Sequence, residues 1–131
     1  MPLPFWLLLA GVMLPYIWGG VGVAFRKKEF GSLDNSLPRD QQARATGAGA
    51  RALGAERNAW EALAVFTPGV IAAHLFAPAS TLAPTLAMVW LVARVGHGGA
   101  YLANIPPLRS AMFFVGFLCA VGMFLIAGKV L

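Results

Sequence analysis

The stretch ALAVFTPGVIAAHLFAPASTLAPTLAMVWLVA, residues 62–93, decides the fold of this chain because it holds 32 residues and no charge. Two membrane-spanning helices need about 40 predominantly apolar residues. A turn at residues 78–84, which has proline at both ends, divides the run. The two predicted helices must therefore extend beyond the run, one taking in Asn58 and Glu61 and the other Arg94 and His97.

The composition of the whole chain agrees with a membrane protein. Its 131 residues are 59% hydrophobic and 11% charged, with a mean hydropathy of +0.72, whereas soluble domains carry about 25% charge. We therefore expect an all-α integral membrane four-helix bundle with a single domain, residues 1–131. Cys119 is the only cysteine and lies in an apolar run, so we expect a buried thiol and no disulfide framework.

Four spans are predicted, at about residues 3–25, 57–77, 81–102 and 108–130. The first has no basic leader region and no small-residue cleavage site, so we expect it to be retained. The segment EFGSLDNSLPRDQQ, residues 29–42, is polar and contains Pro38, which predicts a loop.

The charges predict the orientation in the membrane. Nine of the ten basic residues fall in the first and third connections, residues 26–58 and 94–109, which share one side of such a hairpin pair. Basic loops are typical of the cytoplasmic side, so we expect both connections in the cytoplasm. The net charge of +5 indicates contact with anionic membrane lipids. We expect no nucleic-acid partner, because the basic residues are not interleaved with aromatic ones on a soluble surface.

Polar residues gather at the charged ends of three predicted helices. On the second helix, positions 47, 51, 54, 58 and 61 share one face, which carries Arg51, Asn58 and Glu61 among glycines. On the third helix, spacings of three and four residues place Arg94, His97 and Tyr101 on one stripe, and Arg109 and Ser110 open the fourth. Ionisable groups at depth in a membrane face one another or a wet cavity. We therefore expect one shared pocket.

Two interpretations of these residues are open. Terminal arginines such as Arg51 and Arg57 commonly snorkel to lipid headgroups, Arg57 is also spaced to pair with Glu61, and the other polar groups can be purely structural. Alternatively, their convergence forms a binding site. Guanidinium groups bind carboxylates, while Glu61 and Asn58 suit ammonium and peptide groups, so the expected ligand is small and zwitterionic. An arginine at the reacting end could also lower the pKa of a thiol and create a thiolate nucleophile.

Three motifs give the chain a family resemblance: RKKEF at residues 26–30, RALGAERNAWE at 51–61 and RVGHGGAYLANIPPLRS at 94–110. With four spans, the chain resembles the MAPEG family, the membrane-associated proteins in eicosanoid and glutathione metabolism. The resemblance implies a homotrimer that binds glutathione between subunits near the cytoplasmic face and requires no metal. The chain resembles bacterial members more than the dedicated eicosanoid enzymes, which implies the bacterial inner membrane.

The resemblance also implies roles for single residues. Asn58 and Glu61 would hold the peptide and amino groups of glutathione, and Arg57 a carboxylate. His97, Tyr101 and Arg94 would line or support the pocket. Arg109 would stabilise the thiolate, with Ser110 beside it.

Departures from the family pattern bear on affinity. Ala24 and Gly54 stand where active members carry arginines, Glu56 replaces a frequent histidine, and Phe113 replaces an aromatic hydroxyl. The loss of two cationic contacts predicts weaker glutathione binding.

The function expected from the resemblance is a glutathione-dependent membrane transferase or peroxidase that acts on hydrophobic electrophiles or lipid hydroperoxides. Two alternatives stay open. One is a small four-helix multidrug-type transporter in which Glu61 exchanges protons for cationic drugs. The other is a protein that keeps the MAPEG fold and has lost the chemistry.

Overall fold

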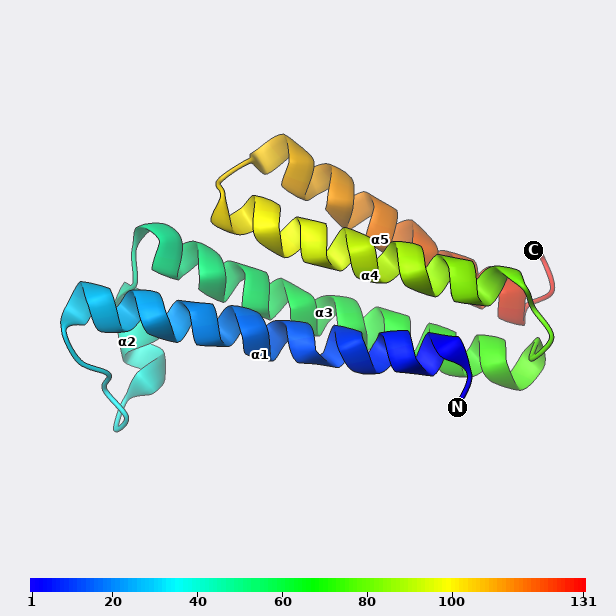
Figure 1. Cartoon of the computed structure of the whole chain (residues 1–131), viewed down its shortest axis with the longest axis horizontal. Coiled ribbons are helices and arrows are strands. Elements are labelled where there is room, and N and C mark those ends of the chain that lie inside the picture. The colour runs from blue at the N-terminus through cyan, green and yellow to red at the C-terminus, as the bar shows by residue number, and fades with distance from the viewer.

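A computed structural model of the chain shows five helices and no strand. In chain order they are α1 (Leu3–Phe30), α2 (Pro38–Arg44), α3 (Gly47–Phe76), α4 (Leu82–Leu102) and α5 (Pro106–Ala127). The four long helices lie side by side and alternate in direction (Figure 1). Both termini and the α3–α4 turn lie at one end, and the α1–α3 and α4–α5 connections lie at the other. The predicted all-α class is confirmed.

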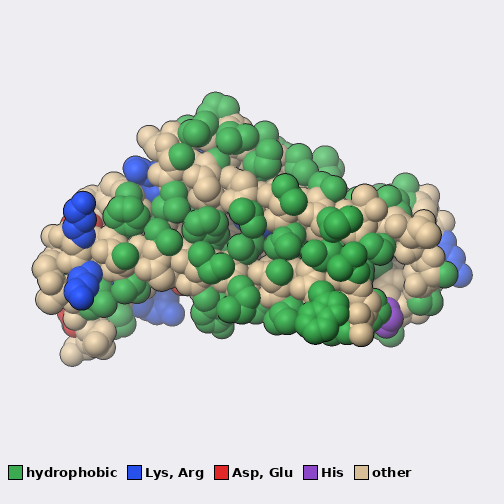
Figure 2. Space-filling view, in the orientation of Figure 1, with side chains coloured by type: hydrophobic (Ala, Val, Ile, Leu, Met, Phe, Trp, Pro, Cys, Tyr) green, Lys and Arg blue, Asp and Glu red, His purple; other side chains and the backbone are tan.

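The outer surface of the molecule is apolar along most of its length. Figure 2 shows hydrophobic side chains spread over the visible face, while most Lys and Arg side chains lie toward the end with the α1–α3 connection. Three helices, α1, α3 and α5, are long and apolar enough to cross a membrane. The fourth long helix, α4, is not among them, and it carries Arg94 and His97. These features fit an integral membrane protein, whereas a fourth crossing and a trimer stay predictions.

Two helices are longer than the predicted spans at the charged end. α1 continues through Arg26, Lys27 and Lys28 to Phe30, and α3 begins at Gly47. α1 and α3 therefore have 28 and 30 residues, against 21 and 22 for α4 and α5. A helix need not end where its side chains become charged, because charges on the outer turns reach water or headgroups.

The prediction of a loop over residues 29–42 is wrong for its second half, which forms α2. Pro38 occupies the first turn of this helix, where its missing N–H is not needed. The helix is held by the buried side chain of Gln41, whose Nε2 donates to Ser32 O at 2.8 Å and whose Oε1 accepts from Arg26 Nη1 at 3.4 Å. A seven-residue helix needs such tertiary contacts, since isolated short helices are unstable in water.

The start of α3 is fixed by Glu29, at the end of α1. Its carboxylate accepts from the backbone N–H of Thr46 at 3.2 Å and from the Thr46 hydroxyl at 2.5 Å. Thr46 is the residue that precedes the first turn of α3. A negative group at a helix N-terminus satisfies free N–H groups and complements the helix dipole.

The core lies between α1, α3, α4 and α5 and is built around Trp90. The indole stacks on Phe66 with ring centroids 3.8 Å apart and planes 5° apart. Gly11 of α1 allows this packing, because a Cβ there would lie 2.5 Å from Trp90 Cζ3. Cys119 belongs to the same cluster and is buried and unpaired, as expected.

Candidate functional site

The polar stripe of α4 is buried against α3. Arg94 and His97 are each 3% exposed. The Arg94 Nη2 group donates to Asn58 Oδ1 and to Asn58 O on α3, the latter at 3.4 Å, and lies 3.3 Å from His97 Nδ1. The rings of His97 and Tyr101 pack edge to face with centroids 5.7 Å apart. Buried polar groups need such partners, and these contacts fix how the two helices are aligned.

The α3 face contributes an amide and a carboxylate to the same region. Asn58 Nδ2 donates to Glu61 Oε2 at 3.3 Å, so the amide of Asn58 bridges Arg94 and Glu61. Arg51, two turns earlier, donates from Nε to Leu102 O at 3.1 Å. That carbonyl belongs to the last turn of α4, where carbonyl groups lack helical partners. Arg51 therefore ties α3 to the end of α4.

The connection to α5 turns Arg109 back toward α4. It consists of residues 103–105 only, and Asn104 has a φ of 57°, a left-handed conformation that asparagine tolerates. Pro106 and Pro107 then start α5 in the positions that suit proline. As a result, the Arg109 guanidinium lies over the Tyr101 ring, with Cζ 4.7 Å from the centroid. This is a cation–π contact.

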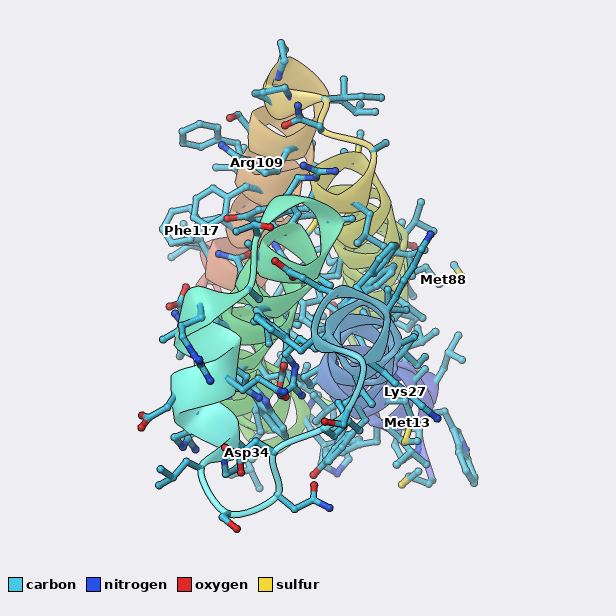
Figure 3. The ribbon with its side chains drawn as sticks, turned by 90° about the vertical axis from the view of Figure 1, so that its left-hand side faces the viewer. Met13, Lys27, Asp34, Met88, Arg109 and Phe117 are labelled. Carbon is cyan, nitrogen blue, oxygen red and sulfur yellow. The ribbon has the colours of Figure 1, made fainter.

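These residues line a hollow of about 370 Å³ at the end with the basic connections. We call it the polar hollow, and its walls are Asn58, His97, Tyr101, Arg109, Ser110, Phe113 and Phe114. It combines one guanidinium, one imidazole, one phenol, one amide and one hydroxyl. Figure 3 views the molecule from this end and labels Arg109 on α5.

An apolar space of about 200 Å³ lies next to the polar hollow, between α3, α4 and α5. We call it the apolar slot, and its walls are Glu61, Ala62, Val65, Trp90, Arg94, Phe113, Gly116, Phe117 and Ala120. Phe113 lines both spaces. Phe117, labelled in Figure 3, projects outward from α5 at the rim.

The structure brings most of the predicted site residues together. Asn58, His97, Tyr101, Arg109 and Ser110 line the polar hollow, and Glu61 and Arg94 line the apolar slot.

The structure leaves Arg51 and Arg57 outside both spaces. Arg51 Nε donates its hydrogen bond to Leu102 O instead. Arg57 is exposed and lines neither space. The Arg57–Glu61 ion pair that the spacing allows does not form, and Glu61 accepts a hydrogen bond from Asn58.

Two glycines act at the site in ways that the sequence did not reveal. A Cβ at Gly54 would lie 2.6 Å from both Cζ and Oη of Tyr101, so the phenol fills the space above this glycine. A Cβ at Gly116 would lie 3.2 Å from Arg94 Cδ, so this glycine leaves room for the arginine. Gly54 lies on the polar face of α3, and this position was the only feature of the sequence that indicated a role for it at the site.

Comparison with known proteins identifies the family of the chain. The sequence profile of the MAPEG family matches residues 3–129. A comparison with curated proteins gives no match. The profile covers almost the whole chain and includes all five helices. The chain therefore belongs to the MAPEG family, the membrane proteins related to glutathione and eicosanoid metabolism.

Proposed function

We propose that this protein is a glutathione-dependent membrane transferase or peroxidase that uses a thiolate stabilised by Arg109. Family membership supports glutathione as the co-substrate. We also propose a homotrimer in a bacterial inner membrane, with the polar hollow on the cytoplasmic side. A second copy would close the hollow, whose rim residues Ser110 and Phe114 are exposed in the single chain.

The observation that carries this proposal is the position of Arg109. Its guanidinium is held over Tyr101 at 4.7 Å, in a hollow that also contains the Asn58 amide and the His97 imidazole. A fixed positive charge beside a thiol lowers the thiol pKa and stabilises the thiolate. Ser110, the next residue on α5, adds a hydroxyl that can donate a hydrogen bond to sulfur.

The other residues would hold glutathione in place. The Asn58 amide and the Glu61 carboxylate suit its peptide and amino groups, and His97 and Tyr101 form the wall. Arg94 positions Asn58 through its Nη2 hydrogen bonds. Arg51 and Arg57 act at a distance: the first by fixing the end of α4, the second as an exposed positive charge that attracts an anionic co-substrate.

The chemistry is attack by the sulfur anion. With an electrophilic carbon, a sulfur–carbon bond forms, and the electron pair leaves with the departing group or moves to a carbonyl oxygen. With a hydroperoxide, sulfur bonds to the terminal oxygen, the O–O bond breaks, and the alkoxide takes a proton. A second glutathione then converts the sulfenic acid to glutathione disulfide and water.

Thiolate formation tests the proposal directly. Glutathione is added to the detergent-purified protein, and the ultraviolet absorbance of the sulfur anion is followed for the parent and for Arg109→Ala. We expect a signal in the parent that Arg109→Ala loses and Arg109→Lys keeps in part. Arg39→Ala is the matched control, since it removes an exposed positive charge of α2 outside the hollow. Absence of a signal in the parent at millimolar glutathione would contradict the proposal.

A further inference from the structure

The α1–α3 connection leaves the bundle sideways. In Figure 1, α2 lies beside α1 and α3, and its axis crosses theirs. Figure 3 shows α2 and Asp34 on the side of the bundle away from α4 and α5. Because the long helices run across the bilayer, a helix that crosses them lies near the plane of the membrane. The connection therefore extends beside the bundle at the end where most basic side chains lie.

Two of the three carboxylates in this connection are already used within the chain. Glu29 accepts hydrogen bonds from the backbone N–H and the hydroxyl of Thr46. Asp34 Oδ1 accepts from two backbone N–H groups of the following turn, at 2.9 and 3.0 Å. The third carboxylate, Asp40, is exposed. The charge that the connection presents to its surroundings is therefore mainly that of its basic residues.

Four exposed basic side chains come from the end of α1 and from α2. We call them the connection cations, and they are Lys27, Lys28, Arg39 and Arg44. Arg44 lies over the Phe30 ring, with Cζ 5.7 Å from the centroid, so its guanidinium is held between α1 and α2. A guanidinium above a ring keeps N–H donors at its edge, where phosphate oxygens can bind.

Two leucines are exposed within this otherwise polar segment. Leu33 is 36% exposed and Leu37 is 58% exposed. Leu37 directly precedes α2, and its backbone N–H is held by Asp34. Apolar side chains among lysines and arginines are typical of segments in the headgroup region, where the apolar groups reach the acyl chains and the cations bind phosphates. The two kinds of side chain therefore match the two layers of a lipid surface.

We propose that the α1–α3 connection is a membrane-surface anchor, in which Leu33 and Leu37 enter the acyl boundary and the connection cations bind the phosphates of anionic phospholipids. The apolar outer surface of the long helices brings lipid next to the connection, and the cations supply the complementary charge. An acidic soluble protein would match the charges alone. The exposed leucines and the sideways position of α2 favour lipid. This inference is independent of the chemistry proposed for the polar hollow.

Hydrogen exchange in lipid nanodiscs tests the anchor on the full chain. The protein is placed in discs of phosphatidylcholine with and without phosphatidylglycerol, and exchange is followed at residues 32–46. We expect exchange there to slow severalfold when phosphatidylglycerol is present, because each Lys or Arg near an anionic surface adds roughly fivefold in affinity. High salt should remove the difference, since it screens exposed charges.

Charge substitutions identify the residues responsible. The compared quantity is the ratio of the exchange rates in the two kinds of disc, which cancels effects of a substitution on α2 itself. Arg39→Gln combined with Arg44→Gln should bring this ratio close to one. Asp40→Asn should increase the slowing, because it removes the exposed negative charge from the same helix. Lys129→Gln is the matched control, since it removes a positive charge near the C-terminus, at the opposite end.

The depth of the leucines needs a separate measurement. Leu37→Cys and Asn35→Cys, each in a Cys119→Ala background, are labelled with a nitroxide, and collisions with oxygen are compared with collisions with a soluble nickel chelate. We expect oxygen, which concentrates in acyl chains, to be favoured at position 37, and nickel at position 35. A preference for nickel at both positions would refute insertion of the leucines.

The exchange results can also overturn the anchor. Equal exchange of the parent in the two discs, or a ratio that the arginine substitutions leave unchanged, would refute binding of anionic lipid. Exchange that is already slow in detergent and insensitive to lipid would show that a second copy of the chain covers α2 instead. Neither result bears on thiolate formation, which is measured separately.

Discussion

Replacing Gly54 by alanine tests the packing that supports the polar hollow. The new methyl would lie 2.6 Å from Tyr101 Cζ and Oη, whereas ordinary contacts begin at 3.4 Å, so the phenol must move by nearly 1 Å. The phenol cannot move freely, because Arg109 lies over its ring and His97 packs on its edge. Arg109 and His97 both line the polar hollow, so a methyl group added at position 54 should displace side chains of the site.

The expected cost follows from two opposing effects. Overpacking of a filled site costs about 1–3 kcal/mol, and alanine in place of glycine gains about 1 kcal/mol within a helix. Gly54→Ala should therefore lower the free energy of unfolding by about 0–2 kcal/mol. Gly99→Ala, at a helical position with no atom within 4 Å of the new Cβ, should raise it by about 1 kcal/mol.

The assay is reversible unfolding in mixed micelles, combined with the thiolate absorbance. In a Tyr101→Ala background the clash is absent, so Gly54→Ala should become stabilising, and the coupling between the two positions should be about 1–3 kcal/mol. Glutathione affinity should fall in Gly54→Ala and stay unchanged in Gly99→Ala. Equal stability changes for the two alanine variants, with no coupling to Tyr101, would refute this account of the glycine.

Three further substitutions test contacts described above. Asn58→Ala removes the side-chain acceptor of the buried Arg94 guanidinium and leaves its bond to the backbone Asn58 O, so it should destabilise the protein by about 1–3 kcal/mol, measurable by unfolding in mixed micelles; no change would mean that the side-chain contact contributes nothing. Glu29→Gln replaces the carboxylate at the start of α3 and should cost about 1 kcal/mol, and hydrogen exchange at residues 47–50 should accelerate while exchange at the centre of α3 does not. Gln41→Ala removes the side chain that holds α2 to Arg26 and should speed tryptic cleavage within α2 severalfold, whereas unchanged cleavage would show that α2 is held by other contacts.

The helices and the polar stripes follow from one-dimensional features of the sequence. The uncharged run at residues 62–93 is too short for two spans, which places Asn58 and Arg94 on helices rather than in loops. Spacings of three and four residues then place the stripe residues on shared faces. Arg57 illustrates the same rule, since it is adjacent to Asn58 and therefore points to another side of α3, where it is exposed.

The features that sequence reasoning missed depend on how the helices cross. Gly54 and Tyr101 are on different helices, and only their contact shows that the glycine accommodates the phenol. Position 54, where the family resemblance implies an arginine, is therefore a packing site for the phenol. α2 was missed because its seven residues include Pro38 and are held by Gln41, a contact made by tertiary structure rather than by helix propensity.

The unequal lengths of the helices make the thickness of the bilayer relevant to this protein. At 1.5 Å per residue, α4 and α5 are roughly 30 Å long, close to the hydrocarbon thickness, whereas α1 and α3 are roughly 40–45 Å. In a thin membrane α1 and α3 must tilt or extend beyond the lipid, and in a thick one the bilayer must thin around α4 and α5. The chain length of the surrounding lipids should therefore set how much water reaches Arg109, which lies in the first turn of α5.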